Sequence, residues 1–322
     1  MSATLFPFAD YWWFYLLFTA LIVSLLALDL LAHRKAHVIA FREAAAWTAV
    51  WILLALAFSY GLFLFATTRF APAVAGQVSL EFVAGYLVEE SLSVDNMFVF
   101  ALVFRYFAVP SRYQHRVLFY GVLGAMVFRG IFIAIGAALI RFHWVLIVFG
   151  LFLIFTGIRM AMEKETKIEP EANPVIRLVR RFLPVTAELH GYRFVVRTGG
   201  LVYLTPLMIV LLVLETTDIV FAVDSVPAVF AVTKEPLVVY TSNVFAILGL
   251  RSMYFLLAGA MDRFHILKYG LAFVLVFVGL KMALLDDLFG GRFPIGVSLA
   301  VICAAIGISI ALSQIFPKGE QR

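Results

Sequence analysis

The chain has 322 residues, of which 64% are hydrophobic and only 14% are charged, and its mean hydropathy is +1.02. This composition excludes an ordinary soluble globular protein and is typical of a polytopic membrane protein. The formal net charge of +5 does not indicate a nucleic-acid partner, because the basic residues are scattered over short loops. The single cysteine, Cys303, excludes an intrachain disulfide and a thiolate zinc site.

Nine apolar stretches are long enough to cross a bilayer as helices. They cover residues 11–31, 44–66, 80–105, 117–140, 144–162, 201–226, 239–260, 266–285 and 294–316. The first stretch follows Asp10 without a basic segment before it or a small-residue cleavage site after it, so it predicts a transmembrane helix and not a signal peptide. We therefore expect an all-α polytopic membrane protein with about nine transmembrane helices.

The loops between these stretches differ in charge. One alternating set contains seventeen lysines and arginines, whereas the other set contains four, at Arg69, Arg141, Lys234 and Arg292. Basic loops stay in the cytoplasm, so this asymmetry predicts an external N-terminus and a cytoplasmic C-terminus. The expected location is the inner (cytoplasmic) membrane, with the lipid bilayer as surroundings.

The loop 163–200 is the one long connection and is expected on the cytoplasmic side. Residues 174–183 have a basic face and an apolar face, which favours packing on the membrane surface or on the helix bundle. Residues 191–200 show an alternating pattern and have glycines at both ends, which favours a short extended hairpin.

Two segments of the chain match each other as an internal repeat. The sequence GIRMA at 157–161 answers GLKMA at 279–283, and Arg129 answers Arg251, at the same spacing of 122 residues. Each unit holds three helices, an odd number, so the second unit must enter the membrane from the opposite face. The expected division is two N-terminal transmembrane helices in 1–66, a first three-helix repeat in 80–162, the cytoplasmic loop in 163–200, a second, inverted repeat in 201–286, and a last transmembrane helix with the C-terminal tail in 293–322.

Six carboxylates lie inside apolar stretches of these two units. They are Glu89, Glu90, Asp95, Glu215, Asp218 and Asp224. Glu89 and Asp95 correspond to Asp218 and Asp224, whereas Glu90 stands one position off the repeat. A charge at the centre of a bilayer costs about 2.5 to 3.5 kcal/mol on insertion scales, so buried acids usually mark an ion or substrate path.

The acids within one segment are not all on one helix face. Asp218 and Asp224 are six residues apart, which places them roughly 120° from each other on an ideal helix. Both can face one ion only if the helix is bent or broken, and Pro227 frees the Val223 carbonyl beside Asp224. We therefore expect a break in this helix at the ion site.

Oxygen atoms are the available ligands. The expected metal ligands are Glu89, Asp95, Asn96, Glu215, Asp218 and Asp224, supported by Ser93, Ser225, Asn243, Arg129, Arg251 and Pro227. The six histidines lie at helix ends or in loops, so the set suits magnesium, calcium or manganese rather than copper or zinc. Arg129 and Arg251 offset part of the negative charge, and they could equally be structural ion-pair partners.

Four segments resemble one family. They are GYLVEESLSVDNMFVF at 85–100, VLETTDIVFAVDSVPAVFAV at 213–232, TSNVFAILGLRSMYFLLAG at 241–259 and LKYGLAFVLVFVGLKM at 267–282. They resemble the signature segments of the TerC family of integral membrane proteins, most closely its Alx branch. The resemblance implies a nine-helix protein related to the LysE-type exporters, associated with manganese export and with tellurite resistance. Carried over, its acidic set is Glu89, Asp95, Glu215, Asp218 and Asp224.

The sequence thus predicts a manganese(II) exporter that uses a midplane acidic site and is coupled to protons or to the membrane potential, with Mn2+ as the transported ion and no permanent cofactor. One alternative is a transporter of another divalent cation or small cation. Another is a membrane assembly or metal-loading factor without flux of its own. An enzyme is not expected, because the membrane segments hold no paired nucleophile and base. The sequence identifies no protein partner.

Overall fold

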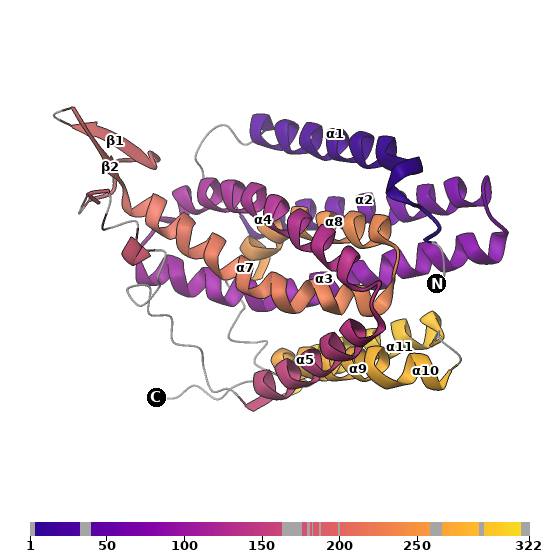
Figure 1. The fold of residues 1–322 in the computed structure, drawn as a ribbon. Helices are drawn as coiled ribbons and strands as arrows, with labels where there is room; N and C mark the ends of the chain where they lie inside the picture. The colour runs from indigo at the N-terminus through magenta and orange to yellow at the C-terminus, as the bar shows by residue number, and fades with distance from the viewer. Residues whose placement is uncertain are drawn as a thin grey trace.

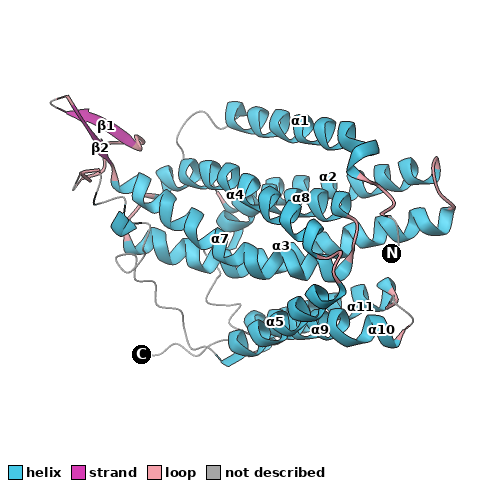
Figure 2. Cartoon of the chain, in the orientation of Figure 1, coloured by secondary structure: helices cyan, strands magenta, loops and turns pink. Residues whose placement is uncertain are grey.

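The computed structural model describes residues 4–32, 40–162, 176–178, 181, 183–186, 188–198, 200–257, 266–289 and 293–316. Helices make up most of these residues (Figure 2). They are α1 (Phe8–Ala32), α2 (Phe41–Thr67), α3 (Pro72–Tyr106), α4 (Ser111–Leu139), α5 (His143–Met162), α7 (Pro206–Val232), α8 (Pro236–Leu257), α9 (Leu267–Leu280), a π-helical turn (Lys281–Leu285), α10 (Asp286–Leu288) and α11 (Ile295–Ile315).

The long helices run side by side in a bundle (Figure 1). Helix α8 packs on α2, α3 and α4, and α7 packs on α3 and α4. Helices α5, α9 and α11 pack together as a second group beside this bundle, while α1 lies along its other side (Figure 1). The central helix α8 is buried over most of its length, whereas α1 and α11 expose most of theirs.

Seven helices of the described chain are long and apolar enough to cross a membrane. The two further long elements are α3, which is 35 residues long but carries several acids, and α9, which runs directly into the π-helical turn. The outward faces expose large apolar side chains such as Leu17, Leu53 and Phe155, which would be costly in water. The protein is therefore a polytopic all-α membrane protein, and nine spans and their orientation stay predictions.

Prolines set several helix starts. Pro72, Pro206 and Pro236 each stand at the first position of a helix, where the missing N–H costs nothing. The predicted helix over 201–226 was therefore wrong at its first residues, because the helix begins only at Pro206 and continues to Val232.

Residues 201–204 instead form the second strand of a hairpin. Strand β1 (Val195–Thr198) pairs antiparallel with β2 (Leu201–Leu204), and Gly200 adopts a positive φ of 84° in the turn. The extended hairpin predicted for 191–200 thus exists a few residues later in the chain. It projects from one end of the bundle, while the N-terminus lies near the other (Figure 1). Half of the amphipathic stretch 174–183 lies outside the described residues.

Helices α5 and α9 approach each other through glycines. A Cβ at Gly157 would lie 2.7 Å from the Ala272 carbonyl oxygen, and a Cβ at Gly279 would lie 2.6 Å from the Gly150 carbonyl oxygen. Small residues let two helix backbones come this close, as in other membrane bundles.

The turn between α7 and α8 is held by polar contacts. Glu235 accepts hydrogen bonds from the backbone N–H groups of Leu5 (2.9 Å) and Phe6 (3.3 Å). The Thr233 hydroxyl donates to Glu81 of α3 at 2.5 Å. Lys281, only 3% exposed, donates to the Ala231 carbonyl oxygen at 2.8 Å. That carbonyl belongs to the last turn of α7, where helical partners are missing.

Candidate functional site

The buried side chain of Arg129, on α4, lies at the centre of the polar interior. Its Nη2 and Nε atoms donate to the two carboxylate oxygens of Asp218 on α7, at 3.0 and 3.3 Å. Its Nη1 atom forms an ion pair with Glu89 of α3. Arg129 is 1% exposed and Glu89 is 0% exposed, so this charge network is fully desolvated.

Two neutral side chains complete the surroundings of the guanidinium. Nη1 of Arg129 donates to the Ser225 hydroxyl at 3.3 Å and to the Asn243 amide oxygen at 3.4 Å. The Asn243 amide nitrogen in turn donates to Glu89 at 2.8 Å. Oxygen atoms from α3, α7 and α8 therefore converge on one cation that α4 supplies.

Glu215 lies one helical turn before Asp218 on α7 and within electrostatic range of it. Its carboxylate fills the space where a Cβ at Gly124 of α4 would stand, so a larger residue there would displace it. The Oε2 atom of Glu215 is enclosed and has no hydrogen-bond partner among the described residues. The contact explains why α4 has a glycine at this position.

Asp95 and Asp224 form a second acidic group. Asp224 accepts a hydrogen bond from the Thr156 hydroxyl of α5 at 3.5 Å, and it lies within electrostatic range of Arg159 and of Asp95. Both aspartates are half-buried. The matched acids of the two repeats thus lie near each other, as the sequence predicts, but in two groups instead of one.

Pro227 does not break the helix. Helix α7 runs without interruption from Pro206 to Val232 with Pro227 inside it. Asp218 faces Arg129, whereas Asp224 faces α5. The predicted break that would turn both acids toward one ion is therefore wrong in this structure.

The remaining predicted residues have different surroundings. The Glu90 carboxylate lies beside Gly249 of α8, where Trp51 of α2 is also close. Its two carboxylate oxygens have no hydrogen-bond partner in the described part of the chain. Ser93 and Asn96 are buried on α3, and Arg251 is 7% exposed on α8. The structure thus agrees with the weak place of Glu90 in the repeat.

Among the described residues, no group of three or more His, Cys, Asp or Glu side chains is arranged to hold a metal ion. The closest approach to such a site is the oxygen set around Arg129, which has two carboxylates, an amide and a hydroxyl. A guanidinium, and not a gap, lies at its centre.

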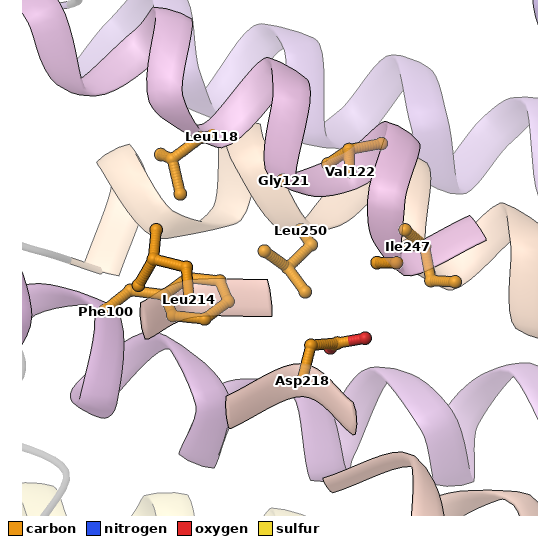
Figure 3. Close-up of a pocket in the computed structure, with 9 residues that line it drawn as sticks. Phe100, Leu118, Gly121, Val122, Leu214, Asp218, Ile247 and Leu250 are labelled. Atoms are coloured by element: carbon orange, nitrogen blue, oxygen red, sulfur yellow. The ribbon is translucent and has the colours of Figure 1, made fainter. Parts of the chain in front are cut away.

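A pocket borders Asp218 on the side of the bundle that carries the hairpin. Its cavity volume is about 20 Å³, which is room for roughly one water molecule. Figure 3 shows the Asp218 carboxylate beside the apolar side chains that form the rest of the lining. Those residues are Phe100, Leu118, Gly121, Val122, Ala125, Leu214, Ile247 and Leu250. The pocket gives the acidic centre a neighbouring space on one side.

The sequence interpretation missed three polar residues that lie near the acids or near the turn between α7 and α8. They are Thr156, Arg159 and Lys281. Arg159 and Lys281 were visible as matched residues of the repeat, 122 positions apart, and that match could have marked them.

Comparisons with known proteins agree with these features. The sequence profile described as "Integral membrane protein TerC family" matches residues 74–321. An Escherichia coli K12 protein named "Putative membrane-bound redox modulator Alx" is 48% identical over 288 residues, which are 88% of this chain and 89% of that protein.

Two further relatives extend the match. A Myxococcus xanthus membrane protein, STKORF319, is 48% identical over 300 residues, 92% of this chain and 91% of its own. The Photorhabdus laumondii Alx protein is 45% identical over 293 residues, 91% of each chain. No solved structure matches the chain significantly. The chain therefore belongs to the TerC family of integral membrane proteins, on its Alx branch.

Proposed function

We propose that the protein exports manganese(II) across the inner membrane, from an acidic centre formed by α3, α7 and α8. The observation that carries this proposal is the full enclosure of Arg129 by oxygen atoms of Glu89, Asp218, Ser225 and Asn243. A centre that stabilises one buried cation with oxygen ligands has the chemistry to bind another. Carboxylate, amide and hydroxyl oxygens suit hard divalent ions such as manganese.

Inverted repeats form part of the proposal. Helices α5 and α9 make two equivalent contacts, one between Gly157 and Ala272 and one between Gly279 and Gly150. Gly157 corresponds to Gly279 in the repeat, and Gly150 corresponds to Ala272, each at a spacing of 122 residues. The packing of α3 on α8 likewise answers the packing of α4 on α7. Both observations support two three-helix units related by a two-fold axis, as in many transporters.

The two ends of the bundle differ, which favours alternating access. Phe100 and Leu214 line the pocket, and their counterparts 129 residues away are Val229 and Gly85. These counterparts touch instead of leaving space, since a Cβ at Gly85 would lie 3.2 Å from Val229 and 2.9 Å from the Ser242 hydroxyl. We interpret the structure as a state in which a small pocket lies on the hairpin side of the centre, while the other side is packed closed.

The charge of the loops assigns the hairpin side to the cytoplasm. Cysteines at Thr198, in β1, and at Lys234, in the α7–α8 turn, test this in a Cys303→Ser background, because both positions are exposed. An impermeant thiol reagent should label Lys234→Cys in intact cells and label both after lysis. Labelling of Thr198→Cys in intact cells would refute the orientation. Thr233 is unsuitable as a reporter because it is 2% exposed.

Two alternatives predict different results. A transporter of another small cation would change the accumulation of that cation and leave manganese unaffected. A membrane assembly or metal-loading factor would leave all fluxes unchanged. The redox role in the name of the Escherichia coli relative has little support here as thiol chemistry within one chain, because the chain contains one cysteine.

The decisive measurement is metal-resolved accumulation in cells that express the protein and in cells that lack it. We expect manganese to fall in the expressing cells while magnesium, calcium and zinc stay constant. Equal manganese in both, at verified membrane abundance, would refute export.

A further inference from the structure

We propose that the Arg129 guanidinium is an internal competitor for the transported ion: it occupies the cation-binding position, and a divalent metal binds by displacing it. This inference rests on the proposed function and concerns the regulation of the same site.

The first argument is the geometry. Arg129 reaches Asp218 with two parallel N–H···O contacts at 3.0 and 3.3 Å and pairs with Glu89 through its other terminal nitrogen. Ser225 and Asn243 offer oxygen atoms to the same nitrogen at 3.3 and 3.4 Å. Every oxygen that a metal would need here is therefore already directed at the guanidinium. Arginine and metal cannot both occupy this position.

The second argument is charge. Glu89 and Asp218 carry two formal negative charges, and Arg129 offsets one of them. A divalent cation in place of the guanidinium would offset both, and it would make the desolvated site neutral. The site therefore favours a doubly charged occupant over the arginine that holds it.

The third argument is access. Asp218 is both a main partner of Arg129 and a lining residue of the pocket on the hairpin side. Among the described residues, Asp218 is the one charged residue that lines this small pocket, so it is the ligand of Arg129 nearest to the space from which an ion could approach. Arg129 lies on α4 and the oxygen ligands lie on α3, α7 and α8, so its release breaks the polar contacts that link α4 to these three helices.

This arrangement has a transport consequence. When the metal leaves, Arg129 can return to the same oxygens, so the emptied centre never holds two desolvated and uncompensated carboxylates. The arginine thus weakens binding of the ion and makes its release possible. A purely structural arginine would do neither.

The test uses the purified full-length protein in detergent with Mn2+ alone as the probe. We expect Arg129→Gln to lower the melting temperature in metal-free buffer and to tighten the apparent Kd for Mn2+ by on the order of tenfold or more, because a ligand binds more weakly when its site is free for only a fraction of the time. Saturating Mn2+ should restore the melting temperature. Calorimetric titration and a melting curve on one preparation provide both values.

Two further variants keep the test decisive. Arg129→Lys retains the charge but loses the planar two-point contact, so it should fold and bind Mn2+ with an affinity between those of the parent and of Arg129→Gln. The matched control is Lys281→Gln, which removes a buried cation that contacts a backbone carbonyl instead of the acids. Its affinity for Mn2+ should equal that of the parent.

The outcomes separate the two proposals. Unchanged or weaker binding in Arg129→Lys, or in folded Arg129→Gln, overturns the competition even if the parent exports manganese. Tighter binding in both variants supports the competition. If cells at the same time show no manganese flux, only the proposal of export is refuted. An equal gain in Lys281→Gln would mean a general charge effect and would also overturn the inference.

Discussion

Arg159 at the end of α5 and Lys281 after α9 occupy equivalent positions in the two proposed repeats, yet their surroundings differ. Arg159 is exposed and lies near Asp224, whereas Lys281 is 3% exposed and donates to a carbonyl of α7. A repeat sequence has therefore folded into unequal halves. At the end of the bundle where Lys281 is buried, Gly85 of α3 also packs against Val229 of α7, whereas the pocket is lined by residues of both repeats.

Equivalent residues of the two repeats therefore have different surroundings in this conformation. If the halves exchange during transport, the exposed arginine and the buried lysine should exchange surroundings as well. Substitutions at the acids, the glycines, the basic pair and the proline test this comparison.

The largest effect is expected at the matched aspartates. Asp95→Asn and Asp224→Asn each remove a charge without changing volume, and we expect each to abolish manganese efflux while membrane abundance stays near normal. Manganese accumulation in expressing cells measures this. Asp10→Asn, at an exposed acid near the start of α1, is the control and should export normally. Export at the parent rate by either core variant would break the equivalence of the two positions.

The second effect concerns the glycine contacts between α5 and α9. Gly157→Ala and Gly279→Ala each force a Cβ against a carbonyl oxygen, and overpacking of this kind costs roughly 1 to 3 kcal/mol. We expect similar decreases in melting temperature for both. Gly130→Ala, where nothing lies within 4 Å of the new Cβ, should show none. A large difference between the first two would argue against a two-fold axis between these helices.

A smaller, local effect is expected at the basic pair. Lys281→Met leaves the Ala231 carbonyl without its partner, which costs about 1 to 3 kcal/mol, while the removal of a desolvated charge offsets part of that cost. Hydrogen exchange in residues 226–235 should therefore become several-fold faster. Arg159→Met should leave the corresponding residues at the end of α3 unchanged, because Arg159 is exposed. Equal acceleration at both ends would mean that both halves are closed alike.

The smallest functional effect is expected for Pro227→Ala. Asp218 and Asp224 already face different helices in an unbroken α7, so closing one more helical hydrogen bond should leave the affinity for Mn2+ unchanged. The melting temperature should stay equal or rise, since proline disfavours a helix interior by about 3 kcal/mol. A clear loss of affinity would restore the idea that the proline shapes the ion site.

Much of the helical fold follows from the sequence, because apolar runs of bilayer length leave few other options. The run 144–162 matches α5 within one residue, and 294–316 matches α11 equally well. The error at 201–205 arose because no charged residue separates the apolar strand β2 from α7. Hydropathy cannot separate the two, although Pro206 is a local signal for a helix start.

The candidate site was less predictable than the helices. Repeat matching identified Glu89, Asp218 and Arg129 as important, but it could not tell that the arginine lies between the two acids. That arrangement depends on how α4 is rotated against α3 and α7, which the spacing along a single helix does not encode. The separation of Asp224 from Asp218 was missed for a similar reason. Asp224 contacts Thr156 of α5, and this contact between two helices cannot be deduced from the sequence of α7 alone.

The contact between Glu235 and the first residues of the chain has a consequence for the order of assembly. The N–H groups of Leu5 and Phe6 bind a carboxylate 230 and 229 residues later in the sequence. At a synthesis rate of about 5 to 20 residues per second, that partner emerges roughly 10 to 50 seconds after the N-terminal segment. The hydrogen bonds that hold Leu5 and Phe6 can therefore form only after α7 and the following turn have been synthesised. Until then, α1 lacks this contact.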